Sequence, residues 1–286
     1  MMKSVTPFSM RIGWQNDRKQ KVCVCALFAV ILMGIAVFAP FLCPWDPNGQ
    51  DYAAALQAPN RLHLLGTDAY GRDMLSRSIM GAHVSILSAG IVVILSTSIG
   101  MSIGTHCAWF GGKMDTLAMR LADVCLAFPP LVFALAVTAV FHGGIEIAML
   151  ALLGSSWPKY ARLARNQTLM LKEQPFIEAA QLAGSSPQQI MIRHIMPNIG
   201  STMITTAVLD MGTVMMELAA LSFLGLGAKP PMAEWGSMMN VGRSMLQTYP
   251  WVIFAPGAAI FLSVAIFNVL GDSLRDYWDI RKKGSR

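Results

Sequence analysis

Long apolar stretches alternate with short polar segments along the whole chain. Runs with little or no charge cover residues 22–43, 84–112, 124–141, 147–157, 195–227 and 244–271. A helix needs about 20 apolar residues to cross a hydrocarbon core of ~30 Å, and all runs but the fourth approach or exceed that length. The pattern therefore predicts an all-α, polytopic membrane protein with six transmembrane helices, of which the fourth is short and least well bounded.

Composition and loop charge give the same interpretation and add a topology. Hydrophobic residues make up 54% of the chain and charged residues only 13%, whereas a soluble globular chain carries roughly 25% charged residues. With the N-terminus inside, 17 of the 22 basic residues fall in cytoplasmic segments, as the positive-inside rule requires. Both termini are then expected in the cytoplasm. The formal net charge of +6 follows from this topology, so it does not point to nucleic-acid binding.

The cytoplasmic segment between the fourth and fifth predicted spans is too long for a simple connector. It runs for about 36 residues from 158 and is expected to hold two short helices, the first beginning near Tyr160. Gly184 is placed to end this helix, because glycine adopts the left-handed conformation without a Cβ penalty. Ser186 followed by Pro187 and Gln189 predicts a capped second helix, which Pro197 is expected to end.

Two roles are open for this helix–glycine–helix unit on physical grounds. An amphipathic segment held at both ends by membrane spans suits docking into a groove on a cytosolic partner. The same segment can instead pack beneath its own bundle. The pattern of residues alone favours neither role.

The spacing of the residues in this segment resembles the EAA loop of binding-protein-dependent ABC importer permeases. The matching positions are Glu178, Ala179, Ala180, Gly184, His194, Met196 and Pro197. His194 and Met196 stand where that family often has isoleucine and leucine. The resemblance implies the type I permease fold, a bacterial inner-membrane location, and a loop of coupling helices that docks on a cytosolic ATPase.

Three further segments resemble the dipeptide, oligopeptide and nickel permeases within that family. They are residues 65–73, residues 221–227 with Trp235-Gly236, and residues 267–276. Residues 156–162 and 209–212 look most like nickel-type members, which favours nickel or a nickel chelate slightly over di- and oligopeptides. The resemblance implies as partners a second, homologous permease, two ABC ATPase subunits and a periplasmic or lipid-anchored solute-binding protein, besides membrane lipid.

The chain is expected to divide into four parts. Residues 1–21 are expected to form a cytoplasmic tail, and residues 22–82 the first transmembrane helix with a periplasmic loop. Residues 83–272 would then form the permease core, which includes the coupling loop 158–197. Residues 273–286 are expected to form a second cytoplasmic tail.

Asp210 and Glu217 are the two charged residues of the fifth predicted span. They are seven residues apart and therefore share one helix face. Ionisable residues at this depth normally face a bundle interior or a water-filled cavity, so both are candidates for lining a translocation path. The alternative is a structural hydrogen-bonding role toward the partner permease.

Several kinds of chemistry find no support in the sequence. No G-x-x-x-x-G-K-[ST] phosphate loop is present, so the chain is expected to be a non-catalytic subunit, with ATP and Mg on its partners and no cofactor of its own. The five cysteines and five histidines lack metal-ligand spacing, and no metal site is expected. A stand-alone secondary transporter or channel remains the main alternative, and an intramembrane protease using Asp123 and Asp210 lacks the sequence context of that class.

Overall fold

The computed structural model describes residues 8–284, and the side chains of residues 19–278 within them. Within this range the protein is helical, and its one extended contact is an isolated antiparallel bridge between Thr67 and Asp73. The helices are α1 Phe8–Leu42, α2 Met74–Phe110, α3 Gly112–Leu126, α4 Pro130–Val140, α5 Ile145–Lys172, α6 Pro175–Leu182, α7 Pro187–Ile190, α8 Met196–Phe223, α9 Trp235–Gly242 and α10 Trp251–Gly284.

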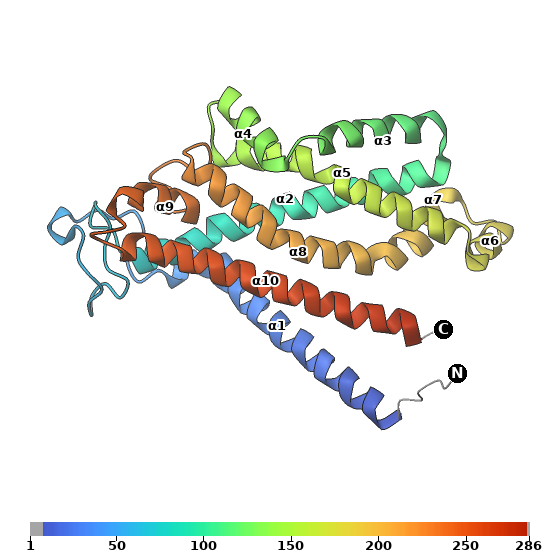
Figure 1. Ribbon diagram of the computed structural model, residues 1–286, viewed down its shortest axis with the longest axis horizontal. Coiled ribbons are helices and arrows are strands. Elements are labelled where there is room, and N and C mark those ends of the chain that lie inside the picture. Colours follow the sequence, from blue (N-terminus) through green and yellow to red (C-terminus); the bar gives the residue numbers. More distant parts are fainter. Residues whose placement is uncertain (1–7, 285–286) are drawn as a thin grey trace, which may run out of the picture.

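The long helices run lengthwise through an elongated bundle (Figure 1). The loop before α2 and the short helix α9 lie at one end, and α6 and α7 lie at the other. The start of α1 and the end of α10 lie toward the end that carries α6. The two ends of the described chain therefore lie on the same side as the predicted cytoplasmic segment, as an even number of crossings requires.

Four segments are long and apolar enough to cross a membrane, within the part of the chain that is described. They are Lys19–Leu42, Met74–Phe110, Pro187–Phe223 and Trp251–Trp278. A bent pair, α3 and α4, adds a fifth if the two helices count as one span. Helix α5 is the candidate for the sixth predicted span, because its 28 residues make it about 42 Å long. It is not among the helices that are apolar enough to cross a membrane, so the count of six stays a prediction.

The third predicted span, 124–141, is not one straight helix. It is divided between the end of α3 and the whole of α4, which meet at an angle of 84°. Two consecutive prolines, Pro129 and Pro130, occupy the break, and Pro130 begins α4. Proline lacks an N–H donor and disfavours helical geometry in the residue before it, so the pair ends one helix and starts another.

The fourth predicted span and the first predicted cytoplasmic helix are parts of the same element. Helix α5 continues without a break through Pro158 to Lys172, so the helix start expected near Tyr160 is wrong, whereas the membrane boundary expected at residue 158 stays a prediction. The segment outside the long helices begins only at Glu173. It contains α6 and α7 and is correspondingly shorter than predicted.

The expected helix end at Pro197 is also wrong. A five-residue π-helical segment, Met191–Ile195, joins α7 to α8, and Pro187–Phe223 forms one continuous span of 37 residues. In the π segment the N–H of Met196 donates to the carbonyl of Met191. This register change, one residue wider than an α-turn, lies directly before Pro197 and accommodates its missing donor without ending the helix.

Small residues allow α2 and α5 to pack very closely. A Cβ added at Gly100 would lie 2.6 Å from the carbonyl oxygen of Trp157, and one at Gly104 would lie 2.2 Å from that of Ala161. Helices in membranes associate through such small-residue faces, because lipid provides no hydrophobic drive for packing. This close packing against α2 supports the second half of α5, which contains most of its charged residues.

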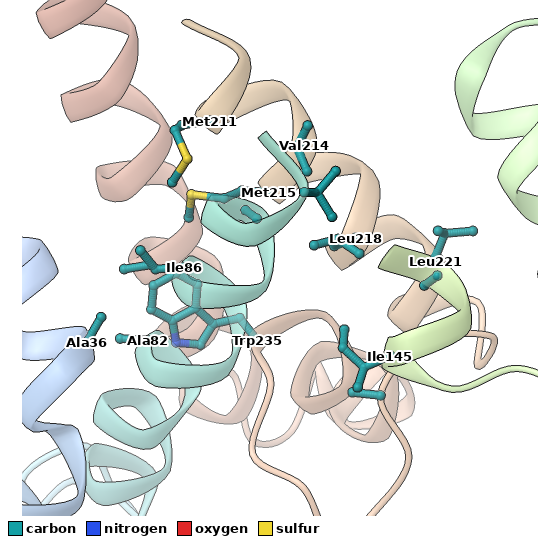
Figure 2. Close-up of a cluster of buried hydrophobic side chains, with 14 of the residues drawn as sticks. Ala36, Ala82, Ile86, Ile145, Met211, Val214, Met215, Leu218, Leu221 and Trp235 are labelled. Carbon is teal, nitrogen blue, oxygen red and sulfur yellow. The ribbon is translucent and has the colours of Figure 1, made fainter. Parts of the chain in front are cut away.

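The main buried cluster joins the long helices α1, α2, α5, α8 and α10 to α9. Figure 2 shows Trp235 of α9 among side chains of α2 and α8 that include Ile86 and Met215. Trp235 is 2% exposed and its indole N–H donates to the carbonyl of Ser78 at 2.9 Å. A second cluster at the other end of the bundle packs α5, α6, α7 and α8 together.

Candidate functional site

The helix–turn–helix segment, residues 175–190, has the local structure that its sequence predicts. Ser186 and Gln189 form the expected reciprocal capping box: the hydroxyl of Ser186 accepts from the N–H of Gln189, whose side chain accepts from the N–H of Ser186 at 2.9 Å. Gly184 has a φ of +82°, in the left-handed region that ends helices. The N–H of Ser185 donates to the carbonyl of Ala180 at 3.1 Å and closes the turn.

One face of this segment is anchored to the membrane bundle. Ile177 and Ile190 are both 0% exposed and belong to a cluster with Trp109, Tyr160 and Ile195. Full burial of an aliphatic side chain contributes about 1.5–3 kcal/mol. The segment is therefore fixed to the bundle at one point in α6 and one in α7.

The opposite face is open and partly apolar. Leu182 is 90% exposed, and Ile192, in the π-helical segment directly after residue 190, is 64% exposed. Glu178, Ala179 and Gly184 are also exposed. The two roles considered from the sequence are therefore compatible, because packing under the bundle uses one face and leaves the other free. The remaining predicted positions are Ala180 and His194, both half-buried, and Pro197, which is exposed.

Asp210 lies in a polar cluster with two residues of α5. Its carboxylate accepts from the ammonium of Lys159 at 2.6 Å and from the phenol of Tyr160 at 2.7 Å. Its side chain is 13% exposed, whereas that of Lys159 is 52% exposed. Sequence reasoning placed Lys159 in a cytoplasmic loop and missed this pair, because Pro158 was taken as the end of the fourth span.

Glu217 does not contact Asp210 by a hydrogen bond in the described part of the chain, although both lie on one side of α8. It is half-buried. Neither acidic residue is enclosed in the core of this chain, so both are available to water or to a partner.

A continuous polar stripe connects these two residues along α8. It consists of Thr202, Thr206, Asp210, Thr213 and Glu217. At about 100° per residue these positions fall within a sector of about 80°, and they extend over roughly 22 Å of helix. None of the five side chains is fully buried. A membrane-spanning helix with such a stripe must face water or protein on that side, because lipid cannot satisfy it.

A pocket of about 400 Å³ lies beside the end of the stripe nearer α7. The helices α5, α8 and α10 form its walls. Lys159, Leu163 and Gln167 follow one another at four-residue spacing on α5, so the row that pairs with Asp210 continues into the pocket. The pocket is lined by Leu163, Gln167, Ser201, Thr202, Thr205, Thr206, Leu209, Arg275 and Trp278.

At the other end of the bundle, residues 65–73 form a compact ion-paired loop. Asp68 accepts from Arg72 at 2.7 Å and lies 3.7 Å from Arg77. Asp73 caps α2 by accepting from the N–H of Ser76, and the indole of Trp251 donates to the carbonyl of Thr67 at 3.1 Å. This sequence pattern therefore builds a rigid connection between the starts of α2 and α10.

Residues 221–236 pack α9 onto the ends of α2 and α8. Glu234 is 1% exposed; its carboxylate accepts from the N–H groups of Gly236 and Ser237 and from Ser85. Burial raises the pKa of Glu234, against the effect of these hydrogen bonds. Gly236 is required by close contact, because a Cβ there would lie 2.2 Å from the carbonyl oxygen of Ala219.

Within the described residues no group of three or more His, Cys, Asp or Glu side chains is arranged to hold a metal ion. The five histidines and five cysteines of the chain are accordingly dispersed in that part of the structure.

Comparison with known proteins gives two family matches. Residues 96–284 match the family described as "Binding-protein-dependent transport system inner membrane component". Residues 10–59 match the "N-terminal TM domain of oligopeptide transport permease C". The first match alone covers more than half of the chain.

Individual relatives and a solved structure agree with these matches. The chain is 40% identical over 273 residues to the glutathione transport system permease protein GsiD of Escherichia coli O1:K1 / APEC, covering 95% of this chain and 90% of that protein. It is equally similar to the protein of the same name from Shigella boydii serotype 4 (strain Sb227). A chain of the inward-facing MetNI methionine ABC transporter shares the fold, with a TM-score of 0.57 at 17% identity, over 71% of this chain and 97% of that one.

Membership of this family accounts for the observed architecture: an all-helical, multi-pass inner-membrane bundle of the type I permease fold, without a nucleotide-binding loop. The chain belongs to the inner-membrane components of binding-protein-dependent transport systems and is a non-catalytic permease subunit of an ABC importer.

Proposed function

We propose that this permease imports a small peptide or peptide-like solute, and that the polar stripe of α8 lines its path. The stripe is the observation that carries the proposal. It places Asp210 and Glu217, with three threonines between and beyond them, on one accessible face of a membrane-spanning helix. A second, homologous permease would complete the path by covering this face.

The choice of solute is supported by the relatives. The proteins that are 40% identical over nearly the whole chain are named as glutathione permeases, and glutathione is a peptide. The N-terminal match is to an oligopeptide permease domain. These names favour a peptide as the solute over nickel or a nickel chelate. The resemblance of residues 156–162 and 209–212 to nickel-type permeases slightly favours nickel instead.

The helix–turn–helix segment is the proposed contact with the ATPase subunits. Its buried face, Ile177 and Ile190, holds it to the bundle, and its exposed face presents Leu182 and Ile192 to the cytosol. An exposed leucine at the end of α6 and an exposed isoleucine in the π-helical segment after α7 suit insertion into a groove on a partner. ATP and Mg would be bound by those subunits, with no cofactor on this chain, and a periplasmic or lipid-anchored binding protein would deliver the solute.

The proposed transport cycle is alternating access. Closure of the ATPase subunits moves the helix–turn–helix segment, and the movement passes into α8, with which α7 is continuous. The face that carries Asp210 and Glu217 then opens toward the binding protein. Both chain termini would lie in the cytoplasm.

Water access to the stripe tests the proposal directly. In a background with the five cysteines replaced by alanine, Thr213→Cys is compared with Ile204→Cys, which is also exposed on α8 but lies about 180° away at 100° per residue. In the assembled importer a membrane-impermeant maleimide should label the first during ATP turnover and leave the second unlabelled. Equal labelling of both, or none at position 213, would refute the path assignment.

Uptake into proteoliposomes tests the solute. The complete importer with its binding protein is supplied with labelled glutathione, a labelled dipeptide or nickel-63. Accumulation of either peptide, dependent on ATP, supports the proposal. Accumulation of nickel alone would contradict it and restore the nickel assignment.

A further inference from the structure

The pocket between α5, α8 and α10 contains several hydrogen-bond donors that have no acceptor among the side chains and backbone that the structure describes. Arg275, Gln167 and Trp278 make no side-chain hydrogen bond or ion pair within the described residues, although all three line the pocket. The hydroxyls of Ser201 and Thr202 are also unengaged there. In contrast, Thr205 and Thr206 each donate to a carbonyl of their own helix, at 2.9 Å.

Among the residues whose side chains the structure describes, none that lines this pocket is acidic. The nearest acidic neighbour along α8 is Asp210, and both of its oxygens are already engaged by Lys159 and Tyr160. Asp272 and Asp276 flank Arg275 in sequence but do not line the pocket. Arg275 has no ion pair among the described side chains, and it therefore brings a positive charge to a cavity of about 400 Å³.

The set of groups fits an anion with two or more oxygen atoms. A guanidinium binds a carboxylate or phosphate through two parallel N–H···O bonds, which a lysine cannot reproduce. The amide of Gln167, the indole of Trp278 and the free hydroxyls add neutral donors around it. The donors and the lack of carboxylates make the pocket unsuited to a bare metal cation, which prefers oxygen and nitrogen acceptors.

We propose that this pocket binds a carboxylate of the transported solute on the cytoplasmic side of the path, with Arg275 as its principal partner. The inference rests on the proposed function and narrows it to solutes that carry a carboxylate. The pocket shares Thr202 and Thr206 with the polar stripe, and its wall on α5 continues the row from Lys159. A solute that moves along the stripe therefore reaches the pocket on the same side of α8.

A phospholipid headgroup offers similar anionic chemistry, and Trp278 with Arg275 near the end of α10 resembles an interfacial pair. The position favours the solute, because Thr202 and Thr206 of the stripe line the pocket. Charged and hydroxyl-bearing residues along one helix face are poorly suited to a lipid-facing surface.

Direct binding to the nucleotide-free importer tests the pocket. Equilibrium dialysis compares labelled glutathione with its dimethyl ester, in which both carboxylates are blocked, using the complex in phosphatidylcholine nanodiscs. The wild type should bind the acid at least about tenfold more tightly than the ester, as expected for a charge-assisted bond. Arg275→Gln should abolish this preference, Arg275→Lys should keep part of it, and Arg120→Gln, which removes an exposed cation outside the pocket, should leave it unchanged.

The outcomes separate this inference from the proposed function. If wild type and Arg275→Gln prefer the acid equally, or the wild type shows no preference, the pocket assignment is wrong even where glutathione uptake is normal. If the complex hydrolyses ATP but neither binds nor imports glutathione or a dipeptide, the solute class is wrong and the pocket's ligand with it. A loss of bound phosphatidylglycerol from Arg275→Gln, in nanodiscs that contain this lipid and without any acid preference, would identify a headgroup site and overturn the inference.

Discussion

Substitution of Gly184 is the sharpest test of the helix–turn–helix segment. Its φ of +82° lies in a region where a side chain with a Cβ costs roughly 1–2 kcal/mol, and a β-branched side chain more. A Cβ at Gly184 would meet nothing within 4 Å in this chain. The cost of Gly184→Val is therefore conformational, and it acts on the turn that sets the angle between α6 and α7.

The size of this conformational cost predicts a graded series of effects among Gly184 variants. A cost of about 2 kcal/mol corresponds to roughly a 30-fold change in the population of the native turn. Asparagine tolerates the left-handed region better than other non-glycine residues, so Gly184→Asn should be mild, Gly184→Ala intermediate and Gly184→Val severe. The assay is the ratio of solute imported to ATP hydrolysed in proteoliposomes, with membrane insertion followed by protein yield.

Gly34→Val is the matched control. A Cβ at Gly34 also meets nothing within 4 Å, and its φ lies outside the positive range, so this change should leave the ratio unaffected. Normal coupling by Gly184→Val would refute the reasoning. Equal losses for asparagine and valine would show that a partner's contact with the glycine, rather than turn geometry, is what matters.

Three further predictions concern packing, the path and pH. Gly104→Ala should lower the stability of the detergent-solubilised protein by about 1–3 kcal/mol, because its Cβ would lie 2.2 Å from the carbonyl oxygen of Ala161. The melting temperature measures this loss. As a control, Gly200→Ala should be neutral or stabilising, because a Cβ there meets nothing within 4 Å. Asp210→Asn should change the uptake rate without reducing co-purification of the ATPase subunits, and loss of assembly would favour a structural role instead. Because burial raises the pKa of Glu234 above its ordinary value of 4.5, the folded state binds its proton more tightly than the unfolded state. The stabilisation by Glu234 is then fully present at pH values below 4.5 and declines as the pH rises through the raised pKa. The melting temperature of Glu234→Gln should lack this decline. Identical pH profiles of the melting temperature for the wild type and Glu234→Gln would contradict the prediction.

Local signals along the chain predicted local structure well. The capping box at Ser186 and the left-handed Gly184 are set by contacts within a few residues, and both are present. The proline pair at 129–130 separates α3 from α4, as the missing N–H donor of proline requires. In each case the backbone chemistry of one or two residues decides the outcome.

The errors arose where tertiary packing outweighs a local signal. Pro158 looked like a helix boundary, yet α5 continues through it. The backbone of α2 packs against α5 at this level through Gly100, close to the carbonyl of Trp157, and this contact compensates for one missing hydrogen bond. The same misplacement hid the pair between Lys159 and Asp210, since that pair depends on α5 remaining helical beside α8.

The continuity of α7 and α8 bears on how the proposed docking surface and path communicate. Two separate helices joined at Pro197 would need a hinge or a second contact to transmit movement. Instead, Pro187–Phe223 is one span, so the capped end at Ser186 and the carboxylate of Asp210 belong to the same helix, roughly 35 Å apart along its axis. The π segment Met191–Ile195 is the one irregular point between them, and it is held by Met191 and Ile195, both at most 1% exposed. A displacement of α7 by a bound ATPase must therefore move the cytoplasmic part of α8 with it, and the polar stripe begins only about two turns beyond the π segment.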